Sequence, residues 1–66
     1  MVKKGDHVEW NTSQGKTEGE VVDRKTDDFE LDGKQRRASD DDPQVVVESD
    51  KSGKEAAHKE SSVDKA

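Results

Sequence analysis

Apolar residues alternate with polar ones over several short segments of the chain, which is the pattern of strands with one buried face. Val8 and Trp10 alternate with polar residues in DHVEW, and residues 28–31, DFEL, repeat the pattern. Residues 17–24, TEGEVVDR, and 45–47, VVV, are rich in the β-branched side chains that favour strands. No segment shows the 3.6-residue apolar spacing of an amphipathic helix, so the pattern predicts an all-β chain.

Glycines in polar surroundings predict the turns between these strands. Gly15 lies in the polar cluster NTSQGK, and Gly53 lies in SDKSGK. Asp32-Gly33 separates the extended segments FEL and KQRRA, and Asp-Gly is a strong signal for a type I′ hairpin turn, in which both residues need positive φ. Gly19 lies inside the second strand, where it predicts a bulge or a sharp bend, as at a barrel corner.

The C-terminal third of the chain predicts one more strand and a short end segment. Residues 55–58, EAAH, follow the Gly53 turn and are assigned to a closing strand. A short helix over KEAAHKE is the alternative, because Ala, Glu and Lys are good helix formers. Residues 59–66 hold one sizeable apolar residue, Val63, and are expected to be a frayed tail or a single turn.

About five short strands joined by turns predict a small barrel or sandwich. Closure into a barrel would remove the free sheet edges that an open meander exposes. We therefore predict a single domain at residues 1–58, a five-stranded barrel, followed by the end segment 59–66. Its expected core consists of Val8, Trp10, Val21, Phe29, Leu31, Val45 and Val47, with Ala57 as a further candidate and with Val22 and Val46 on the opposite faces of their strands.

Composition limits the classes of function. The 66 residues are 24% hydrophobic and 44% charged, close to the composition of disordered chains, but the clustering of the apolar residues favours a folded domain. The net charge of −5 argues against general nucleic-acid binding, which needs a basic surface. There is no Cys for a disulfide or thiolate metal site, and no apolar run of about 18 residues for a membrane span. The expectation is a soluble, cytoplasmic protein.

Three stretches, in this order and at this spacing, form a pattern that can be compared with known families: KGDHVEW (4–10), GKTEGEVV (15–22) and ASDDDPQVVVESDKSGKEAAHK (38–59). Over residues 3–59 the chain resembles the hypervirulence-associated protein Tudor domain. The resemblance implies a Tudor-like or SH3-like β-barrel of about five strands. The end segment HKESSVDK departs from the family pattern, with Glu60 and Val63 near positions where Pro and Leu are common.

Trp10 and Phe29 are the only aromatic residues besides the histidines, and both are candidate ligand-binding residues. Tudor domains proper often hold methylated Lys or Arg in a cage of several aromatic rings, and two rings do not make such a cage. For Trp10 two interpretations stay open: a stacking platform for a ligand, or a core residue whose indole edge reaches the surface.

Arg36 and Arg37 belong to the basic run KQRR, which could contact phosphates or could be the charged edge strand of a sheet. The acidic run Asp40-Asp41-Asp42 lacks the ligand spacing of a calcium loop and is expected to be a solvated loop. His7 and His58 could meet on the first and last strands, but two imidazoles make a poor metal site. We expect no metal, no cofactor and no catalytic set.

The leading hypothesis is a non-enzymatic interaction module that binds a protein or peptide through a groove near Trp10 and Phe29. One alternative is a small barrel that binds nucleic acid, which the acidic balance disfavours. The other is a highly charged accessory protein that acts under osmotic or desiccation stress, suggested by the charged fraction alone.

Overall fold

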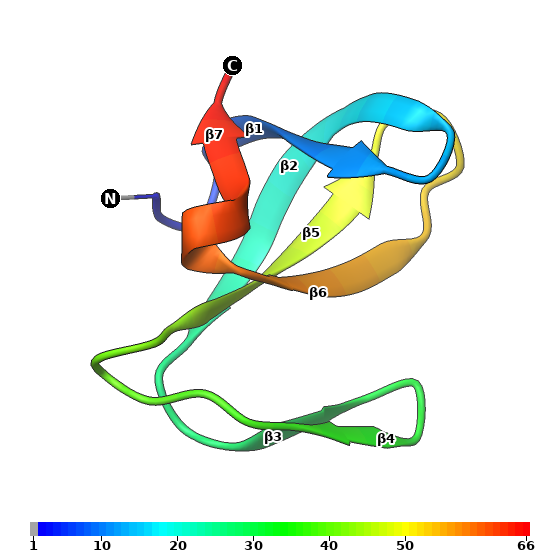
Figure 1. Ribbon diagram of the computed structural model, residues 1–66. Helices are drawn as coiled ribbons and strands as arrows, with labels where there is room; N and C mark the ends of the chain where they lie inside the picture. Colours follow the sequence, from blue (N-terminus) through cyan, green and yellow to red (C-terminus); the bar gives the residue numbers. More distant parts are fainter. Residues whose placement is uncertain (1) are drawn as a thin grey trace.

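In a computed structural model, which describes residues 2–66, the chain forms seven short strands and one turn of 3₁₀-helix (Figure 1). The all-β prediction is confirmed. No helix in this part of the chain has the length and apolar character needed to cross a membrane. The elements are β1 (His7–Thr12), β2 (Gly15–Lys25), β3 (Phe29–Leu31), β4 (Lys34–Arg36), β5 (Gln44–Ser49), β6 (Glu55–Lys59), η1 (Glu60–Ser62) and β7 (Val63–Lys65).

Five of the strands form one antiparallel sheet in the order β6-β5-β2-β1-β7, and β3 and β4 form a separate hairpin. The long strand β2 lies at the centre, where its first half pairs with β1 and its second half with β5. The turn η1 carries the chain from β6, at one edge of the sheet, to β7 at the other. No ladder joins β6 to β7 in residues 2–66, so closure into a five-stranded barrel is not confirmed.

The turns lie where the glycines predicted them. Asp32 and Gly33 connect β3 to β4 with φ of 53° and 74°, the two positive angles of a type I′ turn. Gly15 follows a two-residue loop that links β1 to β2, and Gly53, with φ of 70°, lies between β5 and β6. The strand assigned to EAAH is confirmed as β6.

Of the two features predicted at Gly19, a bulge or a sharp bend, the bulge is wrong. The register between β2 and β5 shifts between Val21 and Asp23, which makes Val22 the extra residue. Gly19 instead lies where two strands approach closely, because a Cβ there would be 2.0 Å from the carbonyl oxygen of Glu48 and 2.8 Å from Cη2 of Trp10. A glycine inside a strand can mark either a bulge or a close approach of another backbone. Only the packing of β5 against β2 shows that Gly19 marks a close approach.

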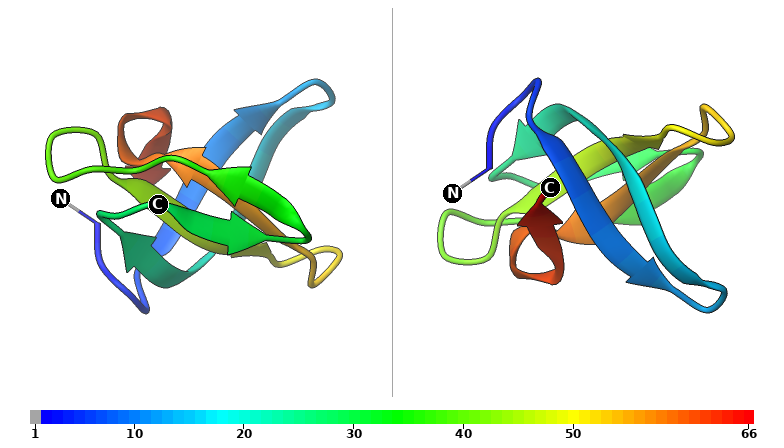
Figure 2. Two further views of the ribbon diagram at one scale, coloured as in Figure 1. Left: turned by 90° about the horizontal axis from the view of Figure 1, so that it is seen from below. Right: turned by 90° about the horizontal axis from the view of Figure 1, so that it is seen from above.

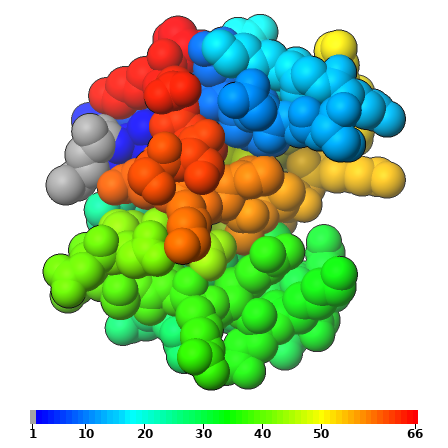
Figure 3. All heavy atoms as spheres, in the orientation of Figure 1, coloured from blue at the N-terminus to red at the C-terminus, as the bar shows by residue number. Residues whose placement is uncertain are grey.

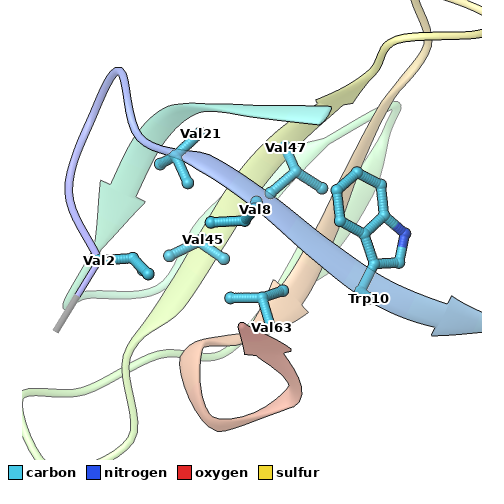
Figure 4. Close-up of a cluster of buried hydrophobic side chains, with 7 residues drawn as sticks. All are labelled: Val2, Val8, Trp10, Val21, Val45, Val47 and Val63. Atoms are coloured by element: carbon cyan, nitrogen blue, oxygen red, sulfur yellow. The ribbon is translucent and has the colours of Figure 1, made fainter. Parts of the chain in front are cut away.

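The main core is a cluster of valines around Trp10, on one face of the sheet (Figure 4). Four of its side chains, Val8, Val21, Val45 and Val47, are fully buried, as the alternation predicted. Two members, Val2 and Val63, come from segments outside the predicted core, and each is 6% exposed. Short strands with few large side chains therefore bury a core made mostly of valine.

Phe29 and Leu31 do not belong to this core, which corrects the prediction. Both are half-buried on the β3–β4 hairpin, where they border a recess shared with Val22 and Val46. Figure 2, left, shows the hairpin lying across one face of β5 and β6. Val46 is 5% exposed although it faces away from the main core, because the hairpin covers it. The sheet thus has a second, smaller apolar layer on its other side.

Residues 59–66 contain the single turn that was expected and one further strand. In β7, Val63 lies opposite Trp10 of β1, and the backbone N–H of Ala66 donates to the carbonyl of His7 at 3.0 Å. A part-buried ion pair joins Arg24 Nε to a carboxylate oxygen of Glu60 at 2.5 Å and holds η1 against β2. These contacts order the end of the chain.

Candidate functional site

A groove of about 410 Å³ opens between the β1–β2 turn and the β5–β6 turn, with Trp10 at its base. It lies at the end of the sheet beyond Trp10, which is the last residue of β1 that pairs with β7. Lys54, Glu55 and Ala56 form its border on the β6 side. The rest of its lining is hydroxyl and amide side chains from both turns and from the adjoining strand ends: Thr12, Ser13, Gln14, Thr17, Ser49 and Ser52.

Trp10 contributes to the core and to the groove at once. Its side chain is 5% exposed overall, and its six-membered ring packs beside Gly19. The indole nitrogen lies on the side away from the valines in Figure 4. Trp10 also lines the groove, so part of its ring is accessible there. The groove therefore contains one aromatic ring that the core holds in place.

His58 covers one side of Trp10. The two ring centroids are 5.5 Å apart and the rings are tilted by 38°. Burial lowers the pKa of His58 below its usual 6.5, and the positive charge of Arg36 lowers this pKa further. At neutral pH the imidazole beside Trp10 is therefore uncharged.

This lowered pKa predicts how stability depends on pH. Because His58 binds its proton less readily in the folded chain than in the unfolded one, the free energy of unfolding should fall as pH drops below the usual histidine pKa of 6.5. His7, whose pKa is raised by its hydrogen bond to Asp50, has the opposite effect: its contribution is full below 6.5 and is lost as pH rises through the folded-state pKa. Urea unfolding of H58Q should show a smaller loss at acidic pH than the wild type, and H7Q a larger one. An unchanged pH dependence in H58Q would contradict this assignment.

The other predicted site residues lie elsewhere. Phe29 borders the recess on the far side of the sheet, so one groove does not contain both Trp10 and Phe29. Arg36 lies opposite Phe29 in the β3–β4 ladder and is half-buried, with its Nε lacking a partner among the described residues. Arg37 is exposed, and its carbonyl accepts a hydrogen bond from Nε2 of Gln44 at 2.6 Å. Ligand binding by these four residues stays a prediction.

The remaining candidates are separated by the fold. His7 lies 3.0 Å from Asp50, whereas His58 packs on Trp10, so the two histidines do not meet. Ser39 and Asp42 close a small turn in the acidic run through reciprocal backbone hydrogen bonds of 3.2 Å. Within residues 2–66 no group of three His, Asp or Glu side chains is placed to hold a metal ion.

Sequence reasoning missed most of the groove lining. The polar clusters around Gly15 and Gly53 predict turns, and the structure confirms both. Nothing in either cluster shows that the two turns face each other, because residues 12–17 and 49–56 come together only through the pairing of β1, β2 and β5.

Comparison with known proteins agrees with this architecture. The family model described as hypervirulence associated proteins TUDOR domain matches residues 5–63. The chain belongs to this family. No curated protein and no solved structure matches it. Tudor-type domains are typically non-catalytic and mediate protein interactions, so membership indicates a small interaction module.

Proposed function

We propose that this Tudor-family domain is a non-enzymatic module that binds a peptide segment of a partner protein in the groove over Trp10. The observation that carries the proposal is the groove itself: an aromatic ring fixed by the core, surrounded by hydroxyl and amide groups of two facing turns. Ligand sites combine aromatic or apolar surface with polar groups that fix the orientation of the ligand, and this groove has both, with polar groups in the majority.

The chemistry of the lining suits a peptide backbone. Amide N–H and C=O groups of a ligand need partners when they leave water. Side chains such as Ser13, Gln14 and Ser52 supply both donors and acceptors. Lys54 and Glu55 lie together at one border, so the groove has no strong preference for ligands of one charge.

The same geometry disfavours two other ligand classes. A methylated Lys or Arg needs several ring faces around the cation, but Phe29 is on the far side of the sheet, and the nearest second ring, His58, packs on Trp10. Nucleic acid needs a basic surface that contacts phosphates, but the groove has one Lys beside one Glu, and the chain has a net charge of −5.

Blocking the groove tests the proposal. In A56R a long side chain would fill the groove from the β6 side, because Ala56 is half-buried in its lining. Peptides selected against the wild-type domain from a random phage-displayed library should bind A56R at least about tenfold more weakly. Their binding should also change the emission of Trp10, the only Trp in the chain.

The matched control is N11R, which adds the same charge at an exposed position of β1 outside the groove lining. Peptides should bind N11R as tightly as the wild type. The proposal fails if no peptide is enriched, or if selected peptides bind A56R and the wild type equally. Salt-sensitive binding of RNA or DNA oligomers instead of peptides would favour the nucleic-acid alternative.

A further inference from the structure

Strand β6 is the edge of the five-stranded sheet, and its outer side has no partner strand within residues 2–66. Figure 3 shows atoms of the β6 region on the front surface, between those of β1 and of the β3–β4 hairpin. Its two charged ends, Glu55 and Lys59, are exposed, whereas Ala57 between them is 8% exposed, because its side chain shares the face of Val46 that the hairpin covers. An edge strand of this kind is a template for pairing with another strand.

The ladder with β5 fixes which backbone groups point outward. The N–H of Ser49 donates to the carbonyl of Lys54, and the N–H of Glu60 donates to the carbonyl of Pro43, both at 3.0 Å. Hydrogen-bonded pairs alternate along an antiparallel ladder. Between these two pairs, the groups of Ala56 and His58 therefore point toward β5. The N–H and C=O groups that point away from β5 belong to Glu55, Ala57 and Lys59.

These three residues are arranged so that β6 complements itself. In an antiparallel pair of two β6 strands centred on Ala57, each Ala57 lies opposite the other, and Glu55 lies opposite Lys59 at both ends. All three outward-pointing residues then fall in hydrogen-bonded positions. Each Glu–Lys pair brings opposite charges together, and such cross-strand pairs stabilise a sheet. Lys59 already lies 3.3 Å from Asp42, but its side chain is 60% exposed, so the ammonium group stays accessible to a second carboxylate.

Other ways of pairing two β6 strands do not place Glu55 opposite Lys59. Parallel pairing would place Glu55 beside Glu55, and like charges directly opposite one another destabilise a sheet. A slip by two residues would remove both Glu–Lys pairs. The charges that usually protect an edge from pairing therefore favour one register here.

We propose that β6 pairs with β6 of a second copy of this chain, in the antiparallel register centred on Ala57, to form a symmetric dimer. The twofold axis of such a pair is perpendicular to the sheet, so the two Trp10 grooves lie on the same face of one continuous sheet. A five-residue edge buries far less than the roughly 1,200 Å² of a stable interface. The dimer is therefore weak and forms at high concentration, or when two copies are held together by a shared partner.

Charge reversal tests the register. In E55K each pair becomes Lys opposite Lys, and in K59E each becomes Glu opposite Glu. Sedimentation equilibrium from micromolar to millimolar concentration should show self-association of the wild type and at least about tenfold weaker association of each variant. An equal mixture of E55K and K59E restores both opposite-charge pairs and should associate like the wild type.

The control is K51E, which makes the same charge change as K59E at an exposed residue of the β5–β6 turn. It should associate like the wild type. In concentrated wild-type samples, amide hydrogen exchange should slow at Glu55, Ala57 and Lys59. A wild type that stays monomeric at millimolar concentration overturns the proposal, as does a mixture of E55K and K59E that fails to associate. Exchange protection confined to another surface overturns it too. None of these results depends on peptide binding in the groove.

Discussion

Replacing Gly19 by alanine is expected to destabilise the domain by at least about 3 kcal/mol, near the upper end of the range for overpacking a well-packed interior. The added Cβ would lie 2.0 Å from the carbonyl oxygen of Glu48, which is backbone and cannot rotate away as a side chain can. It would also lie 2.8 Å from Cη2 of Trp10. Strands β2 and β5 would have to move apart, and the core that rests on them would lose its packing.

Urea unfolding followed by circular dichroism measures this loss. The matched control is G53A, because Gly53 has a φ of 70° and open space around its Cβ position. That substitution should cost only about 1–2 kcal/mol, the strain of a left-handed alanine. If G19A proves no more destabilising than G53A, β2 and β5 are not held together as tightly as the structure shows.

Truncation of Trp10 to alanine is expected to cost about 3–5 kcal/mol, which is comparable to the whole stability of a domain this small. Trp10 is the largest side chain of a core otherwise made of valines. Its side chain packs beside Gly19 of β2 and against the ring of His58, and its backbone lies opposite Val63 of β7. W10A should therefore be largely unfolded at room temperature.

The contrast with Phe29 makes this prediction specific. F29A should cost clearly less than W10A, because Phe29 is half-buried and packs on the hairpin layer, away from the main core. Thermal unfolding by circular dichroism would compare the two, with W10F as a conservative variant that keeps a ring in the core. An F29A variant as unstable as W10A would mean that the hairpin layer and the main core fold as one unit.

Several features of the fold could be predicted because they depend on neighbours in sequence. The type I′ turn at Asp32 and Gly33 follows from the positive φ that both positions require. The burial of Val8 and Trp10 follows from the alternation of side chains along a strand. Short motifs in a fixed order predict the family, and the family match over residues 5–63 confirms this prediction.

The errors concern contacts between residues far apart in the chain. Phe29 and Leu31 have the alternation of a core strand, but the hairpin that carries them packs on the opposite side of the sheet. Val63 lies in a short polar segment, and it becomes buried because β7 pairs with β1, about 50 residues earlier in the chain. Local pattern cannot distinguish one apolar layer from another, since both give the same spacing.

The sequence by itself determined that this chain forms short strands with turns at its glycines, and that a single Trp has to stabilise most of its small core. Both follow from local backbone preferences and from a composition poor in apolar residues. Only the tertiary structure decided that Gly19 lies where β2 and β5 approach closely, that the turns near Gly15 and Gly53 enclose a groove over Trp10, and that the ladders leave β6 at the edge. These features depend on how β1, β2 and β5 pair, and strand pairing brings together residues that no local pattern connects.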